Sequence, residues 1–249
     1  MASAAIASNA GSEWLAASEV QQRFMQHGLP KVTTVSYSAR CRQVNELGGD
    51  CYHFMSLPEN RVAIAVGDAS GKGLAAALMI SNVQSSLRTA ALFNGNDTAA
   101  TVDVVNRQVC DASLDDRYAT LFYGVFDAST RRLHYVNAGH NPPIVIRRDG
   151  SVQKLEAGGA PVGIFPEAGY EAGTVQLHSG DLVVAYTDGV VEARNAAGAE
   201  WQIEGLSRAA AGCDTRSVEA IVDAIFSAMD QYSCGVQSDD ATVAVLRVQ

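Results

Sequence analysis

Hydrophobic positions along the chain follow two different periods, which predicts a mixture of helices and strands. From Glu13 to Gln26 the apolar side chains recur at helical spacing, and the helix is expected to end at Gly28-Leu29-Pro30. We interpret residues 1–12, which are rich in Ala and Ser, as a disordered leader. We interpret residues 13–30 as an amphipathic helical segment that would serve as a linker or regulatory helix. Two interpretations of it stay open: it packs on its own domain, or it contacts a partner such as a second copy of the chain or an upstream sensor.

Strand-like segments dominate the rest of the chain and are interrupted by helices. The loop Pro58-Glu59-Asn60 is so short that the segments beside it should form a hairpin. Many antiparallel strands interrupted by helix pairs predict an α+β domain over residues 31–249, in which sheet packs on sheet with helices outside. The predicted strands are 32–41, 50–57, 61–69, 118–127, 132–138, 144–148, 152–156, 174–177, 182–187 and 241–248, and the predicted helices are 74–93, 98–113 and 216–232.

Composition narrows the class of protein. The 249 residues carry 27 Asp and Glu against 18 Lys and Arg, a net charge of −9, which argues against binding to nucleic acid or to an anionic membrane. The longest uncharged apolar run, residues 74–80, is far shorter than the ~20 residues of a membrane helix. The five cysteines never form a Cys-x-x-Cys pair, so a disulfide scaffold and a structural zinc site are both disfavoured. We therefore expect a cytoplasmic protein.

Two aspartates are expected to face each other in the predicted hairpin. Simple register about residues 58–60 places Asp50 opposite Asp68. Cross-strand Cβ atoms lie roughly 5 Å apart, and two carboxylates at that distance repel each other unless one is protonated or a cation lies between them. A bulge of one residue would place the side chains on opposite faces and remove the argument.

Further acidic residues lie at the ends of predicted strands. Asp188 leaves an apolar strand, and Asp239 and Asp240 enter one at Ala241. Antiparallel neighbours would bring these ends together, and a cluster of aspartate oxygens suits Mg²⁺ or Mn²⁺ better than zinc. The alternative is ordinary turn chemistry, because Asp beside Gly is common where a strand ends.

The glycine-rich loop from Gly67 to Gly73 lies between a predicted strand and a predicted helix, as phosphate-binding loops do. It has one residue too few for a P-loop, and Gly73 replaces the Ser or Thr that would hold magnesium. A dinucleotide fingerprint matches formally at Gly71-x-Gly73-x-x-Ala76, but no second parallel strand follows the helix. The histidines are scattered, and His140 is interpreted as a turn residue that bonds to backbone groups.

Taken together, these segments resemble the metal-dependent protein serine/threonine phosphatases (PPM family), in the bacterial branch of SpoIIE-like enzymes and sigma-factor regulators. The resemblance spans residues 32–248, and its motifs occur in family order. The matching stretches are Gly48-Gly49-Asp50, Gly67 to Gly73 with Ala75 to Leu78, Ala138 to Pro143, Thr187-Asp188-Gly189 with Glu192, and Asp239 to Thr242.

The resemblance implies a layered α-β-β-α sandwich with two central antiparallel sheets and two Mn²⁺ or Mg²⁺ ions at one end. By position, Asp68 would bridge the ions, the Ala69 carbonyl would bind the second, and Asp188 and Asp239 would bind the first. Asp50 would bind directly or through water, and Asp240 would support a neighbouring ligand. The ions would activate a water molecule for in-line attack on phosphorus.

Two positions depart from the family pattern. Ser70 stands where eukaryotic relatives have a histidine that can act as general acid, and His53 stands where many bacterial relatives have an acidic residue.

The expected function is therefore a Mn²⁺/Mg²⁺-dependent phosphoserine/phosphothreonine protein phosphatase. Family precedent suggests a phosphorylated anti-sigma-factor antagonist as substrate, within a partner-switching stress response. Two alternatives stay open. One is a catalytically silent, metal-binding interaction module of the same pathway, and the other is a hydrolase of small phosphoesters.

Overall fold

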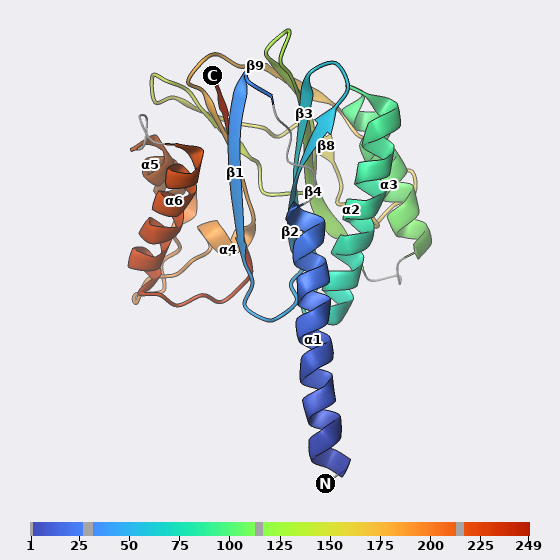
Figure 1. Ribbon diagram of the computed structural model, residues 1–249. Helices are drawn as coiled ribbons and strands as arrows, with labels where there is room; N and C mark the ends of the chain where they lie inside the picture. Colours follow the sequence, from blue (N-terminus) through green and yellow to red (C-terminus); the bar gives the residue numbers. More distant parts are fainter. Residues whose placement is uncertain (1, 27–31, 113–116, 213–216) are drawn as a thin grey trace.

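The computed structural model describes residues 2–26, 32–112, 117–212 and 217–249 as a two-sheet sandwich with helices on both outer faces (Figure 1). The helices are α1 Ala2–Gln26, α2 Leu74–Asn94, α3 Thr98–Ala112, α4 Asp188–Val191, α5 Gln202–Ala211 and α6 Val218–Ser233. The strands are β1 Val35–Arg42, β2 Asp50–Leu57, β3 Arg61–Ala69, β4 Ala119–Asp127, β5 Arg132–Ala138, β6 Ile144–Ile146, β7 Val152–Lys154, β8 Gly158–Gly159, β9 Gly173–Gln176, β10 Leu182–Tyr186 and β11 Ala241–Val248.

The strands form two sheets, as the α+β prediction required. Sheet A has the order β1-β11-β10-β6-β7, and sheet B has the order β2-β3-β4-β5-β8 with β9 paired to β5. All described strand pairs are antiparallel except β5 with β8. The expected meander contained no parallel pair, so this pair is a difference from the prediction. It forms at Gly158 and Gly159, where the backbone approaches β5 very closely: a Cβ on Gly158 would lie 1.8 Å from the backbone oxygen of Asn137.

Three apolar cores hold the layers together. The middle core lies between the sheets and includes Ile64 of β3 and Ala244 of β11. A second core packs the outer face of sheet B against α2 and α3, and a third packs the outer face of sheet A against α5 and α6. Side chains alternate along a strand, so a central strand such as β3 or β11 contributes residues both to the middle core and to an outer core. The arrangement is the α-β-β-α sandwich that the resemblance implied.

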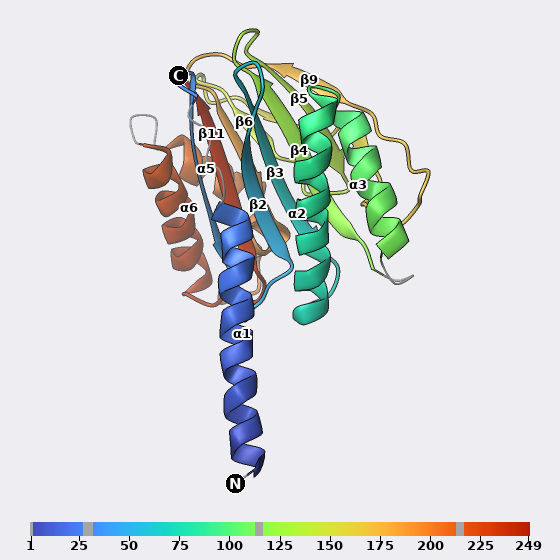
Figure 2. The ribbon, with the colours of Figure 1, turned by 45° about the vertical axis from the view of Figure 1, so that its right-hand side comes forward.

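Helix α1 projects from the sandwich beside α2 and β2 (Figures 1 and 2). It begins at Ala2, so residues 2–12, which we expected to be a disordered leader, are helical in the structure. Their Ala-rich sequence explains the difference, because Ala has the highest helix propensity. Toward its end the helix buries Gln21 and Met25, whereas Leu15 and Val20 are exposed. Within the described ranges, no helix has the length and apolar character needed to cross a membrane.

Two helices were missed from the sequence. The first, α4, is a single turn directly after β10, and the second, α5, lies between α4 and α6. Helix α5 carries an apolar face of Ile203, Leu206 and Ala210, whose spacing was a usable signal.

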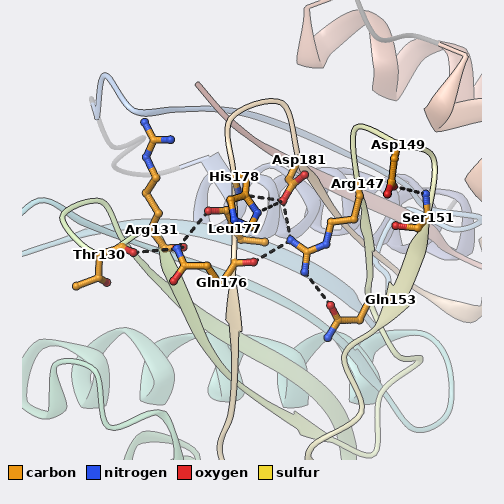
Figure 3. A network of polar contacts seen from close by, with 10 residues as sticks. All are labelled: Thr130, Arg131, Arg147, Asp149, Ser151, Gln153, Gln176, Leu177, His178 and Asp181. Atoms are coloured by element: carbon orange, nitrogen blue, oxygen red, sulfur yellow. Dashed lines mark hydrogen bonds and ion pairs between the residues drawn. The ribbon is translucent and has the colours of Figure 1, made fainter.

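A polar network holds the two sheets together at the end where β10 begins (Figure 3). The guanidinium of Arg147 lies 2.6 Å from the Asp181 carboxylate and donates to Gln176 O at 2.8 Å. Asp181 also accepts a hydrogen bond from the His178 backbone amide, and its side chain is only 3% exposed. The ion pair therefore joins the end of β6 to the start of β10 in sheet A, and the hydrogen bond to Gln176 O links them to β9 of sheet B.

Candidate metal centre

Asp50 and Asp68 face each other across the β2–β3 ladder, as the register argument predicted. Both side chains share the strand face of Ile64 and Val66, which contribute to the core between the sheets. The left-handed backbone of Glu59 and Asn60 closes the hairpin without a bulge, so the register is kept along all of β2. The two carboxylates therefore lie on the face of sheet B that packs against sheet A, at the end of the hairpin away from its turn.

The other aspartates approach from sheet A. Strands β10 and β11 pair with Tyr186 opposite Val243, which brings Asp188, just after β10, beside the segment that leads into β11. The two segments are so close that a Cβ on Gly189 would lie 2.0 Å from the Asp240 backbone oxygen. Glycine is therefore required after Asp188, and the predicted meeting of these strand ends is confirmed.

The carboxylates raise one another's affinity for protons. Burial raises the pKa of Asp68 to about 7, with further contributions from the negative charges of Asp188, Asp239 and Asp240. Burial also raises the pKa of Asp188, and burial and then the charge of Asp68 raise the pKa of Asp50 well above its ordinary value. Negative charge gathered in this way is of the kind that a nearby cation would stabilise.

Asp240 and the Ala69 backbone hold the loop before β2. The Asp240 carboxylate accepts hydrogen bonds from Val44 N at 2.8 Å and Gly49 N at 3.1 Å. On the other side, Ala69 N donates to Gly49 O at 3.0 Å, and a Cβ on Gly49 would lie 3.0 Å from the Ala69 carbonyl oxygen. The loop therefore lies tightly between Asp240 and the end of β3.

Gln21 of α1 contacts the same loop, a contact that sequence reasoning missed. Its side-chain amide donates to Gly48 O at 2.8 Å, and its oxygen accepts from Gly48 N at 3.3 Å and from Gln43 at 3.0 Å. The side chain is 4% exposed. A usable signal was the position of this polar residue between Ala17 and Met25, within the apolar stripe of the helix.

Lys72 is the second residue whose role the sequence did not indicate. Its ammonium lies 2.9 Å from Oδ2 of Asp239 and 3.4 Å from Ser238 O. As the side chains stand, no three acidic, histidine or cysteine groups of the described residues are close enough to enclose one cation. The available donors are nevertheless oxygens from mutually repelling carboxylates, which is the donor chemistry that Mg²⁺ and Mn²⁺ prefer.

The two positions that depart from the family pattern are engaged elsewhere. Ser70 exchanges hydrogen bonds with the Tyr118 backbone, accepting at its hydroxyl from Tyr118 N at 3.1 Å and donating its own amide to Tyr118 O at 2.8 Å. His53 is buried on the face of β2 opposite to Asp50, where it lines a hollow between α1 and α2. Neither residue is placed to support the carboxylates directly.

His140 lies in the turn after β5, as predicted. Its backbone amide donates to the Asn137 side chain at 2.7 Å, and Nδ1 lies 2.8 Å from the Thr120 hydroxyl. Thr120 is the β4 partner of Asp68. Burial lowers the pKa of His140 to about 4, so the ring is neutral at physiological pH.

The chain is similar to known proteins in sequence and in fold. The family described as stage II sporulation protein E (SpoIIE) matches residues 58–249. The phosphoserine phosphatase RsbU of Bacillus subtilis is 29% identical over 186 residues, which cover 74% of this chain and 54% of RsbU. The chain thus spans about half the length of that relative.

Solved structures share the fold. The PP2C phosphatase domain of SpoIIE from Bacillus subtilis, solved with a fragment of its regulatory domain, has a TM-score of 0.75 and 26% identity, covering 88% of this chain and 64% of that one. The SiaA-PP2C domain of Pseudomonas aeruginosa has a TM-score of 0.85 and 19% identity, covering 99% and 100%. The catalytic domain of the phosphatase PstP, solved with two manganese ions, has a TM-score of 0.65 and 18% identity, covering 86% and 98%.

Proposed function

The chain belongs to the stage II sporulation protein E (SpoIIE) family, and from this premise we propose that it is a divalent-cation-dependent phosphatase of phosphoserine and phosphothreonine proteins. The observation that carries the proposal is the convergence of Asp50 and Asp68 from sheet B with Asp188 and Asp239 from sheet A at one end of the sandwich.

Two Mn²⁺ or Mg²⁺ ions are the cofactors we propose for this site. Asp68, Asp188 and Asp239 would hold them, with Asp50 and the Ala69 carbonyl as further ligands. Such ions supply an activated water and stabilise charge during displacement at phosphorus. The solved structure of PstP with manganese, a protein of the same fold, supports this choice.

The chain's own residues bind and orient rather than react with phosphorus. The Asp240 carboxylate accepts hydrogen bonds from two backbone amides of the loop before β2, so its role is to hold that loop. A protein of net charge −9 repels a phosphate that carries close to two negative charges, so the cations are needed for substrate attraction as well. The Ser70 hydroxyl oxygen accepts a hydrogen bond from Tyr118 N. We assign the role of general acid to no side chain of this chain.

The substrate we propose is a phosphorylated anti-sigma-factor antagonist in a bacterial partner-switching pathway, in the cytoplasm. Support comes from the similarity to RsbU and from a structure of the RsbU and RsbW domains of Rv1364c from Mycobacterium tuberculosis, which shares the fold with a TM-score of 0.77 at 23% identity and covers 90% of this chain and 63% of that one. The exposed face of α1 is the surface that we propose for an upstream regulator or a second copy of the chain.

The decisive experiment is release of phosphate from a phosphoserine protein and from para-nitrophenyl phosphate, with Mn²⁺ and with EDTA. We expect activity that needs Mn²⁺ and is lost in Asp188→Asn. The matched control is Asp149→Asn, an exposed aspartate in the β6–β7 turn, which should stay active.

Three results would count against the proposal. Activity in EDTA would exclude the metal mechanism. Mn²⁺ binding without any turnover would favour a silent interaction module. Turnover of the small phosphoester but of no phosphoprotein would favour a small-molecule hydrolase.

A further inference from the structure

Two buried threonines hold the carboxylate of Asp50 from the opposite sheet. Thr187 follows β10 and Thr242 lies in β11, so both belong to sheet A, whereas Asp50 begins β2 in sheet B. Each hydroxyl donates a hydrogen bond of 2.7 Å to Oδ2 of Asp50. Both threonines are 0% exposed, and Asp50 is 2% exposed. The three side chains therefore form a polar tie between the sheets, at the end that carries the candidate metal centre.

The Thr187 hydroxyl is also held by the backbone of Thr242. The hydroxyl oxygen of Thr187 accepts a bond of 2.9 Å from Thr242 N, and Thr187 N donates to Thr242 O at 3.1 Å. An ionised carboxylate can only accept hydrogen bonds, so with Asp50 ionised both threonine hydroxyls donate their proton to Oδ2.

The two donors also select between the oxygens of Asp50. Both hydrogen bonds that the described side chains make to this carboxylate end on Oδ2. Two donors occupy the lone pairs of that oxygen, which leaves Oδ1 as the oxygen that can face a cation. The same tie fixes the distance between the sheet that carries Asp68 and the sheet that carries Asp188.

From this geometry we propose that Thr187 and Thr242 are positioning residues of the metal centre. They fix which oxygen of Asp50 faces the cation and hold the ligands of the two sheets in register with each other. The inference rests on the proposed function, because it requires Asp50 to be a metal ligand. A purely structural role would predict something different: loss of either hydroxyl would lower stability and leave metal affinity unchanged.

The test compares Thr187→Val and Thr242→Val, which remove the hydroxyl at nearly constant volume, with Thr187→Ser and Thr242→Ser, which keep it. The matched control is Thr101→Val, another fully buried threonine, whose hydroxyl donates to the backbone oxygen of Asp97, the residue before α3. The measurements are the Mn²⁺ dissociation constant by calorimetry and the melting temperature in EDTA.

We expect each valine variant to bind Mn²⁺ about tenfold more weakly, the effect of one lost hydrogen bond to a charged group. The serine variants should bind as the wild type does, and Thr101→Val should change the melting temperature without changing the dissociation constant. Valine variants that bind Mn²⁺ as tightly as the wild type would overturn the inference alone. A wild type that binds no Mn²⁺ would overturn the metal part of the proposed function as well.

A second variant keeps the proposal testable if the valine variants do not fold. In Asp50→Asn the side-chain oxygen can still accept both threonine hydroxyls, while the amide nitrogen replaces Oδ1. We expect the melting temperature in EDTA to be kept or raised, because repulsion with Asp68 is relieved, and Mn²⁺ binding to weaken by more than about tenfold. A clear fall in the EDTA melting temperature, or unchanged Mn²⁺ affinity, would contradict the arrangement.

Discussion

The ammonium of Lys72 forms an ion pair with Asp239 at 2.9 Å, so a protein cation contacts a carboxylate that we assign to a metal ion. The side chains of the pair are 62% and 45% exposed, so the pair contributes only about 0–1 kcal/mol after screening by solvent. Lys72 therefore competes with a divalent ion but cannot exclude it.

We accordingly predict that Lys72→Met binds Mn²⁺ more tightly, by up to about fivefold, because the competing charge is removed. Calorimetric titration at low ionic strength measures the effect, which should shrink at high salt. Lys154→Met, at an exposed position in β7, serves as the control and should bind as the wild type does. Weaker Mn²⁺ binding by Lys72→Met would mean that the ammonium supports the site instead.

Replacement of Gln21 by Met should loosen the loop before β2. The variant loses the hydrogen bonds to both backbone groups of Gly48 while keeping most of the buried volume. Opening of the loop should become easier by roughly 1–2 kcal/mol, and the Gly48 amide should exchange its hydrogen roughly 5- to 30-fold faster.

Hydrogen exchange measured by mass spectrometry of peptides from this loop checks the prediction. Gln22→Met, at the exposed neighbouring position of the same helix, should leave the exchange rates unchanged. Equal protection of Gly48 in wild type and Gln21→Met would show that the helix does not restrain the loop.

The polar network at the start of β10 should contribute to stability and not to the reaction. In Arg147→Met the buried Asp181 carboxylate loses its guanidinium partner while it keeps the hydrogen bond from the His178 amide, which should lower the free energy of unfolding by about 3 kcal/mol. Urea denaturation measures this loss. Arg148→Met, an exposed neighbour, should change stability by less than about 0.5 kcal/mol.

Activity provides the second half of this test. Because Asp181 and Asp188 lie at opposite ends of β10, the turnover of folded Arg147→Met at saturating Mn²⁺ should equal that of the wild type. Reduced turnover at a temperature where the variant is fully folded would show that the network also acts on the site.

Acid should destabilise the fold through His140. The folded protein holds this ring neutral with a pKa of about 4, below the ordinary value of 6.5, so the unfolded chain binds more protons between these values. The contribution of the neutral ring to the free energy of unfolding is complete above pH 6.5. It is lost as the pH falls toward 4, which lowers the free energy of unfolding by about 3 kcal/mol in total.

Comparison with His140→Gln isolates this contribution from those of the carboxylates. As the pH is lowered from 7 to 4, the free energy of unfolding of the wild type should fall by more than that of the variant. Urea denaturation measures both values. A difference that stays constant over that range would show that His140 does not titrate as its burial indicates.

The sequence predicted the parts of the site that depend on local patterns. The opposition of Asp50 and Asp68 followed from a three-residue loop and from the period of two in a strand, and both are local properties. The meeting of Asp188 with the segment before β11 followed from apolar strands that end in Asp. The same patterns gave most of the strands that form the two sheets.

What could not be predicted depends on contacts between distant segments. Gln21 and Gly48, or Thr187 and Asp50, are brought together only by the packing of α1 on β2 and of one sheet on the other. A polar residue in an apolar stripe indicates that some partner exists but not which one. The short helix α4 and the two-residue strand β8 carry no periodic signal at all.

Asp68 connects the stability of this protein to its proposed activity. Its carboxylate is buried among Asp188, Asp239 and Asp240, so the metal-free fold bears an unfavourable concentration of negative charge. Asp68→Asn removes one of these charges, and we predict that at pH 8 in EDTA the variant melts at a higher temperature than the wild type. With Mn²⁺ at about 100 times its dissociation constant the order should reverse, because binding stabilises only the wild type, by about 2.7 kcal/mol. Asp149→Asn should follow the wild type under both conditions, and a variant that melts lower than the wild type in EDTA would mean that Asp68 stabilises the fold without any cation.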